Sequence, residues 1–190
     1  MESKITLDSI FVREEKMPNK AEEFYHLDQN LILAQQLMYE PGNFICSSIK
    51  PDTESQEYKA CSFYLNGKKI IYRTSKITPT KNGQFVTVWK RNNAGATAPY
   101  TEKDDFDFFM ISCRKGIELG QFIFPKSVLV KQGIISSQQK IGKRGVRVYP
   151  PWDAMTSKQA LETQKWQINY FVNILPENSN LIEKAKNLLK

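Results

Sequence analysis

Acidic residues stand directly before a strongly apolar segment, in the stretch TEKDDFDFF. Asp105 and Asp107 are of the type that holds Mg²⁺ in restriction-type nucleases, where an Asp and a second acid lie close to a Lys. Such an ion activates water and binds the phosphate. The pattern is incomplete here, because Ser112 and Cys113 stand where the second acid is expected and Glu118 follows only later. Asp105, Asp107 and Glu118 are therefore the catalytic candidates, with Mg²⁺ as their cofactor.

The same acids also have a structural interpretation. Asp104 and Asp105 can cap the loop that contains them, while Asp107 pairs with a Lys or Arg of a neighbouring strand. Other catalytic patterns find no support, since the sequence lacks GxSxG, GxxxxGK[ST] and GxGxxG and has one histidine, His26. We therefore expect no cofactor unless the metal hypothesis holds, and we expect binding rather than catalysis.

Two long windows of the chain contain no Asp or Glu. The first runs from Tyr58 to Thr101 and carries eight Lys and Arg residues, and the second runs from Leu119 to Trp152 and carries six. The whole chain has a net charge of only +7, so the remaining segments are net acidic. Such segregation is typical of a protein with a basic face, and a basic face is the electrostatic signature of nucleic-acid binding.

The stretch ITPTKNGQFVTVWKRNNAGATAPY lies inside the first window and combines cations with an alternating apolar strand and two turn signals. Cations on strands joined by short turns stay close in space, as contact with a phosphate backbone requires. A solvated sheet face, on which lysines suppress edge pairing, is the alternative. The predicted phosphate contacts are Arg73, Lys76, Lys81, Lys90, Arg91, Lys143, Arg144 and Arg147.

Glycines flank Lys143 and Arg144 in the stretch GKRGVRVYPPW, which lets these cations approach a ligand closely. Tyr149 and Trp152, and also Trp89, can stack on bases as aromatic residues do in proteins that bind single strands. Alternatively, Tyr149 and Trp152 belong to the core that introduces the C-terminal helices.

The elements that must position these residues follow from periodicity and turn signals. A strand is expected at 4–12, then a helix that opens at Pro18 and Asn19 and ends at residues 40–43. Asn66-Gly67 predicts a hairpin, whereas Pro79 and Asn82-Gly83 predict further breaks. The remaining expected elements are strands at 58–65, 68–77, 84–91, 106–114 and 145–149, a turn at 92–95, a strand followed by a short helix near 125, and helices at the C-terminus.

Two sequence signals predict the C-terminal helices. Thr156 and Gln159 form a possible capping box, and Leu161, Ile168, Phe171 and Val172 form the apolar face of the helix that follows it. A last helix is expected at about 179–189. Strands in the middle with helices at both ends predict an α+β fold, with residues 1–190 as a single domain.

Composition narrows the class of protein further. The chain has 190 residues, 41% of them hydrophobic, and no apolar run long enough for a membrane span. Charges occupy the N-terminal stretch where a signal peptide needs apolar residues, so we expect a cytoplasmic protein without a membrane partner. Cys46, Cys61 and Cys113 are few and far apart, which favours small buried side chains over a zinc site or disulfides.

Four stretches together resemble the MepB family of bacterial proteins: YRTSKITPTKNGQFVTVWKRN, PYTEKDDFDFFMI, GQFIFPKSVLVKQGI and GVRVYPPWD. The resemblance covers about residues 55–175. It implies a cytoplasmic protein whose gene can accompany multidrug-efflux genes, and a central, mostly antiparallel twisted sheet or partly open barrel similar to the DNA-handling domains of restriction enzymes. It also implies nucleic-acid binding, while the incomplete metal motif argues against inherited nuclease activity.

The leading hypothesis is a non-catalytic protein that binds DNA or RNA, as a monomer or weak homodimer. The second is an enzyme, either a metal-dependent phosphodiesterase or one that acts on a nucleotide or nucleoside-like compound. The third is a protein whose basic face meets an acidic protein partner.

Overall fold

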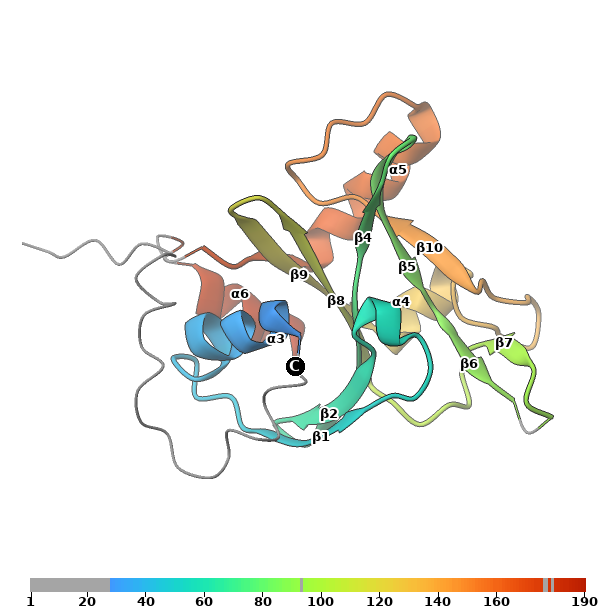
Figure 1. Cartoon of the computed structure of the whole chain (residues 1–190), viewed down its shortest axis with the longest axis horizontal. Helices are drawn as coiled ribbons and strands as arrows, with labels where there is room; N and C mark the ends of the chain where they lie inside the picture. The colour runs from blue at the N-terminus through green and yellow to red at the C-terminus, as the bar shows by residue number, and fades with distance from the viewer. Residues whose placement is uncertain (1–27, 93, 176–177, 179) are drawn as a thin grey trace, which may run out of the picture.

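A computed structural model describes residues 28–92, 94–175, 178 and 180–190 of the chain (Figure 1). Its largest element is a six-stranded sheet in the order β1-β2-β3-β8-β9-β11. All neighbours in this sheet are antiparallel except the central pair β3 and β8. The strands are β1 (Cys46–Pro51), β2 (Cys61–Leu65), β3 (Lys68–Thr74), β8 (Phe108–Lys115), β9 (Glu118–Pro125) and β11 (Phe171–Asn173).

Strand β8 lies in the interior of this sheet because both of its faces are apolar. Phe108 and Met110 pack into one hydrophobic cluster, while Phe109, Ile111 and Cys113 pack into a second cluster on the opposite face. A strand covered on both sides needs a nearly continuous apolar run, which is what the sequence offers here. The expected buried strand at 106–114 is confirmed.

Helices cover one face of the large sheet (Figure 1). Helix α3 (Gln29–Ala34) continues as a π-helical turn, η1 (Gln35–Tyr39), and helix α6 (Leu181–Leu188) packs beside it. The expected end of the first helix at 40–43 and the last helix near 179–189 are confirmed within the described residues. The expected strand at 4–12 and the start of the first helix lie outside the described residues.

The opposite face is covered by a small sheet in the order β10-β5-β4 and by two helices. The strands are β4 (Lys76–Thr78), β5 (Lys81–Thr87) and β10 (Gly145–Val148), and the helices are α4 (Lys126–Lys131) and α5 (Lys158–Gln167). A two-stranded ribbon of β6 (Trp89–Arg91) and β7 (Thr97–Pro99) continues from β5. Two 3₁₀ turns, η2 (Gln56–Tyr58) and η3 (Ile168–Tyr170), complete the elements of the described residues.

The two Asn-Gly pairs behave differently. Asn66 and Gly67 form the predicted hairpin turn between β2 and β3, both with positive φ. The predicted break at Asn82-Gly83 is wrong, because both residues lie within β5 at a shift in its register with β4. Pro79 and Thr80 make the turn instead. The positive φ of Gly83 serves a bulge in the strand rather than a reversal of the chain.

The C-terminal prediction needs a second correction. Phe171 and Val172 do not extend the face of α5 but form β11, which pairs with the free edge of β9. The cap is also displaced by one residue, since the Ser157 hydroxyl, and not that of Thr156, accepts a hydrogen bond from Ala160 N–H at 3.2 Å.

The predicted α+β class, with a central and mostly antiparallel sheet flanked by helices, is nevertheless confirmed. No helix in the described ranges combines the length and the apolar character that a membrane crossing requires.

Candidate nucleic-acid interface

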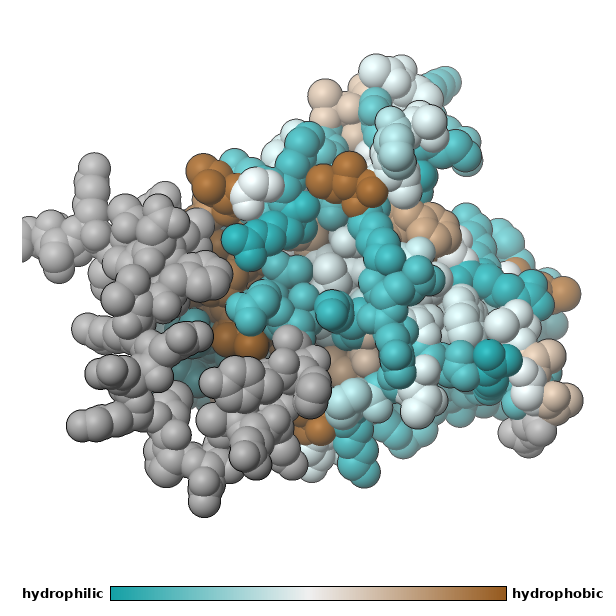
Figure 2. All heavy atoms as spheres, in the orientation of Figure 1, coloured by the Kyte–Doolittle hydropathy of each residue, from teal (hydrophilic) through white to brown (hydrophobic). Residues whose placement is uncertain are grey.

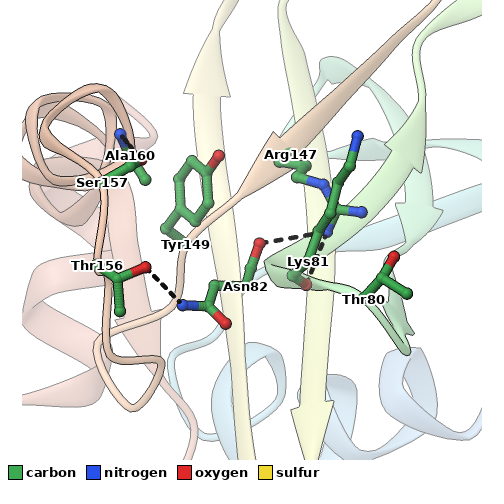
Figure 3. A pocket seen from close by; sticks show the side chains of 8 residues that line it. All are labelled: Thr80, Lys81, Asn82, Arg147, Tyr149, Thr156, Ser157 and Ala160. Atoms are coloured by element: carbon green, nitrogen blue, oxygen red, sulfur yellow. Dashed lines mark hydrogen bonds between the residues drawn. The ribbon is translucent and has the colours of Figure 1, made fainter.

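Two adjoining clefts lie between the small sheet and helix α5, and they share Arg147 and Tyr149 of the β10 segment. The turn cleft has a volume of about 320 Å³ and lies at the β4–β5 turn (Figure 3). The helix cleft has a volume of about 330 Å³ and lies between β10, α5 and the end of α4. The turn cleft is lined by Thr80, Lys81, Asn82, Arg147, Tyr149, Thr156, Ser157 and Ala160. The helix cleft is lined by Gln132, Ile134, Lys143, Gly145, Val146, Arg147, Tyr149, Ser157, Gln159, Ala160, Thr163, Trp166 and Gln167.

Arg147 fixes the floor of the turn cleft. Its guanidinium donates to the backbone carbonyls of Lys81, Asn82 and Gly83 at 3.3, 3.2 and 3.0 Å, and to the Thr78 hydroxyl at 2.6 Å. These partners are all uncharged. The guanidinium therefore holds the β4–β5 hairpin in place while its positive charge stays unneutralised by any acid of the described residues.

Three further predicted cations share this property. Lys81 and Lys143 are exposed, and neither forms an ion pair with a described residue. Arg144 donates from Nε and a terminal nitrogen to the Thr97 carbonyl at 3.2 and 3.0 Å, which ties β7 to the start of β10. We call Lys81, Lys143, Arg144 and Arg147 the open cations.

The other four predicted cations are paired with acids. These acids lie in the segments just before the first acid-free window and between the two windows. Lys76 Nζ lies 3.2 Å from the Glu57 carboxylate, and Lys90 pairs with Asp104. Arg91 pairs with Glu54, which lies in the loop between β1 and β2. The fold thus neutralises about half of the predicted basic surface.

Arg73, the last of these four, lies in the interior and not on the surface. Its side chain is 1% exposed and donates to the Asp52 carboxylate at 3.0 Å, the Tyr72 carbonyl at 2.8 Å and the Tyr100 hydroxyl at 3.3 Å. Because the Asp52 carboxylate neutralises a charge that would otherwise be costly to bury, Arg73 has a structural role beside the central strands. The structure does not bring it together with the open cations.

The three aromatic residues predicted to stack on bases lie in different parts of the structure. Trp152 packs edge-on against Phe171, with ring centroids 5.3 Å apart, and contributes to the core. Tyr149 is half-buried and lines both clefts (Figure 3). Its ring lies against Gly83. A Cβ atom on Gly83 would come within 2.3 Å of this ring, so the absence of a side chain there lets Tyr149 lie flat on β5. Trp89 lies on β6, with the guanidinium of Arg91 5.9 Å from its ring.

The predicted acidic candidates do not converge. Asp107 precedes β8 and accepts a hydrogen bond from Lys69 N–H at 2.8 Å, whereas the backbone of Glu118 lies opposite that of Lys115 at the other end of the β8–β9 hairpin. At about 3.3 Å per residue, the length of β8 separates them by about 23 Å. Asp105 bonds to Lys69 Nζ at 2.8 Å. Within the described ranges, no three His, Cys, Asp or Glu residues gather in a group that could hold a metal ion.

Asp104 is the acid with the most partners at this end of the sheet. It accepts from Thr101 N–H at 2.6 Å and from the Thr101 hydroxyl at 3.1 Å, and it pairs with Lys90. Burial alone would raise the pKa of its carboxyl, but the bonds from Lys90 and Thr101 outweigh burial and lower the pKa below its ordinary value. Asp104 thus caps the loop, as the structural interpretation predicted, and also neutralises Lys90.

Sequence reasoning missed the residues that α5 contributes to the clefts. Gln167 is 1% exposed, and its side-chain amide accepts from Tyr149 N–H at 2.8 Å and donates to the Arg147 carbonyl at 3.0 Å. Gln159 and Trp166 of α5 line the helix cleft, together with Gln132, which directly follows α4. No local pattern identifies these residues, because their role depends on how α5 packs against the outer edge of β10.

Comparisons with known proteins give a family and a solved relative. The model of the MepB-like family matches residues 52–173. A crystal structure of MepB is similar over 77% of this chain and 97% of its own, with 33% sequence identity and a TM-score of 0.68. The structure of a bacterial homing endonuclease is similar over 80% of this chain and 93% of its own, with 14% identity and a TM-score of 0.42. No curated protein matches the chain. The family match includes all the open cations and the whole of α5.

Proposed function

The chain belongs to the MepB-like family, and from the charges on its described surface we propose that it is a nucleic-acid-binding protein. The observation that carries the proposal is the grouping of the open cations around β10, beside two clefts whose lining includes no acid. Lys81 comes from β5, whereas Lys143, Arg144 and Arg147 come from the segment that forms β10, about 60 residues later in the sequence. A polyanion that follows β10 meets all four without displacing an acidic partner.

Phosphate binding depends on charge and on donors that are already in position. Each cation that neutralises a phosphate releases a counterion, which makes the binding favourable at low salt. Arg144 and Arg147 are held by carbonyl oxygens, so less side-chain entropy is lost when phosphate arrives. Neutral donors accompany them, including the hydroxyls of Thr80, Thr156 and Ser157 in the turn cleft. In Figure 2, the face around β4 and β5 is mostly hydrophilic, as a phosphate contact surface requires.

We propose binding without hydrolysis. Two of the acidic candidates have another role in the fold, since Asp105 pairs with Lys69 and Asp107 accepts a hydrogen bond from Lys69 N–H. Asp107 and Glu118 lie at opposite ends of a hairpin. None of the three candidates lines either cleft, so phosphate held by the open cations lies away from them.

The proposal is tested by fluorescence anisotropy with labelled DNA and RNA, single- and double-stranded, at several salt concentrations. With about four phosphate contacts, a plot of log affinity against log salt has a slope of about −3 to −4, which corresponds to about a 100-fold loss of affinity for a fourfold rise in salt. The double variant Lys81→Glu/Lys143→Glu is expected to lose at least about tenfold in affinity at the lowest salt.

The matched control is Lys184→Glu/Lys186→Glu on the exposed side of α6, which changes the net charge by the same amount far from β10. This control should bind nearly as the wild type does. Equal losses of affinity in both double variants would show that binding depends only on the net charge of the protein, and would overturn the proposed interface. Equally feeble, salt-insensitive binding by all three proteins would instead favour an acidic protein as the partner.

A further inference from the structure

The helix cleft differs from the turn cleft in the chemistry of its walls. Trp166 and Tyr149 supply aromatic surface, and Ile134 and Val146 supply aliphatic surface. The side-chain amides of Gln132 and Gln159 line the same cleft, and neither forms a hydrogen bond with the described part of the chain. An amide offers both a donor and an acceptor, as the edge of a nucleobase does. A phosphate alone would need neither the aromatic wall nor these acceptors.

The aromatic walls are held in position before any ligand arrives. Trp166 packs against Phe124 with ring centroids 5.5 Å apart and against Tyr170 at 6.4 Å. Tyr149 is fixed from two sides, by the close approach of its ring to Gly83 and by the bond from its N–H to Gln167. A stacking surface that is already ordered loses little entropy on binding.

The size of the helix cleft decides between an unpaired base and a duplex. Its volume of about 330 Å³ lies at the lower end of the range for sites that enclose small molecules. That space suits the base and sugar of one nucleotide, whereas a base pair within a stacked duplex would have to stay outside. Lys143 and Arg147 stand on the β10 side of the cleft, four residues apart, where they can meet the phosphates on either side of an inserted base.

We propose that the helix cleft takes one unpaired nucleobase, so that the preferred ligand of this protein is a single-stranded or locally unpaired segment of nucleic acid. This inference rests on the proposed function. The base stacks against Trp166 and Tyr149, the amides of Gln132 and Gln159 bond to its edge, and the flanking phosphates lie on the open cations. Stacking tolerates every base, so the expected preference is for unpaired structure more than for sequence.

The test compares ligands with the same phosphates but different bases. Anisotropy is measured with a single-stranded DNA oligonucleotide, its RNA equivalent, a blunt duplex, and an abasic oligonucleotide of equal length. The wild type should bind the single strands at least about fivefold more tightly than the abasic strand, as expected for one stacked base. The fluorescence of Trp166 should be quenched by the single strands and not by the abasic strand.

The variant Ala160→Phe narrows the helix cleft without removing a charge. Because Ala160 also lines the turn cleft, the salt dependence of binding is measured for this variant as well, and an unchanged slope shows that its phosphate contacts persist. Its matched control is Leu161→Phe, which adds an aromatic ring at the next position of the same helix, where the side chain is exposed. The filled variant should bind single strands only as well as the abasic strand, while the control keeps the preference. Circular dichroism and thermal melting establish that both variants fold, and Gln132→Ala provides a second, smaller change in the cleft.

Each outcome has one meaning. A preference for bases that Ala160→Phe removes and Leu161→Phe keeps supports the base site. Equal, salt-sensitive binding of abasic and ordinary strands by the wild type overturns the base site but leaves the proposed phosphate interface intact. An absence of salt-sensitive binding to every strand overturns both. The DNA and RNA arms report which sugar the site accepts.

Discussion

Gln167 pairs with Tyr149 across the outer edge of β10: its side-chain oxygen accepts the N–H of Tyr149 at 2.8 Å, and its side-chain nitrogen donates to the carbonyl of Arg147 at 3.0 Å. One amide thereby supplies the two bonds that a neighbouring strand would supply. Because β10 is the edge strand of the small sheet, this pairing protects the edge and fixes the wall that separates the two clefts.

Replacing Gln167 by Leu should therefore destabilise the protein by about 1–3 kcal/mol, because a buried N–H and a buried carbonyl lose their partners. Urea unfolding measures the change. The control is Gln159→Leu on the same helix, where the side chain is exposed and makes no bond with a described residue; it should change stability by less than about 0.5 kcal/mol. A Gln167→Leu protein as stable as the wild type would show that water replaces the amide at this edge.

Gly83 and Gly67 form a natural pair for separating backbone strain from steric contact. Both have φ near +76°, at +75° and +77°, but a Cβ atom on Gly83 would meet the Tyr149 ring at 2.3 Å, whereas one on Gly67 would meet nothing within 4 Å. Gly67→Ala should cost about 1 kcal/mol for the left-handed backbone alone. Gly83→Ala should cost about 1–3 kcal/mol more, since it also displaces a packed ring.

The same pair of variants tests the link between Tyr149 and binding. Gly83→Ala should weaken nucleic-acid binding even under conditions where the protein stays folded, because Tyr149 lines both clefts. Gly67→Ala should leave the affinity unchanged, as its turn lies in the large sheet. Equal stabilities for the two variants would mean that Tyr149 moves aside freely and does not form a fixed wall.

These glycines also illustrate what the sequence can predict. Alternation of apolar and polar residues correctly indicates extended chain around Val86 and Val88, which are buried while their neighbours are half-buried. The single strand predicted at 84–91 is wrong, however, because the structure divides it at Val88 into β5 and β6, which belong to different sheets. The dipeptide Asn-Gly, however, reports only that the backbone takes a positive φ. Whether that residue turns the chain, as Gly67 does, or bulges within a strand, as Gly83 does, depends on the partner strand, which lies in the tertiary structure.

For the charged residues too, the sequence predicts one part of the result and the tertiary structure determines the rest. The acid-free windows correctly identify segments with many cations, but ion pairing is decided by side chains that are distant in sequence. Arg91 meets Glu54 across 37 residues, and Arg73 is buried because β3 lies in the middle of a sheet. Likewise, the spacing of Phe171 and Val172 fits a helix, but these residues form a strand because they pair with the free edge of β9. Local sequence cannot specify these partners.

Asp104 gives the protein a defined response to acid. Its folded-state pKa lies below the ordinary value near 3.8, because the bonds from Lys90 and Thr101 outweigh the opposing effect of burial. A lowered folded pKa means that the contribution of Asp104 is fully present above the unfolded pKa and is lost as the pH falls through the folded pKa. The wild type should therefore exceed Asp104→Asn in stability by about 1–2 kcal/mol at neutral pH.

That difference should stay constant down to about pH 5 and then shrink as the pH falls through the lowered pKa. Urea unfolding of both proteins at a series of pH values measures it. Asp105→Asn is the control, since Asp105 also pairs with a lysine but is 88% exposed, so its removal should change stability little at any pH. A difference for Asp104→Asn that persists unchanged into strong acid would assign the effect to packing and not to ionisation.

The pairing of Lys90 and Arg91 leads to the last prediction, which concerns the salt dependence of binding. Both cations lie on β6 and already have acidic partners, Asp104 and Glu54, whereas Lys81 and Lys143 have none among the described residues. The slope of log affinity against log salt counts the phosphates that are neutralised by direct contact. Lys81→Gln/Lys143→Gln should therefore reduce the magnitude of this slope by about 1.4–1.8.

Lys90→Gln/Arg91→Gln removes the same net charge but should leave the slope unchanged within about 0.3, because neither side chain contacts a phosphate unless it abandons its acid. Binding isotherms at four or more salt concentrations measure both slopes. If the two double variants reduce the slope equally, Lys90 and Arg91 exchange their carboxylates for phosphates on binding. The interface would then extend from β10 across β6, and Asp104 and Glu54 would be released to solvent in the complex.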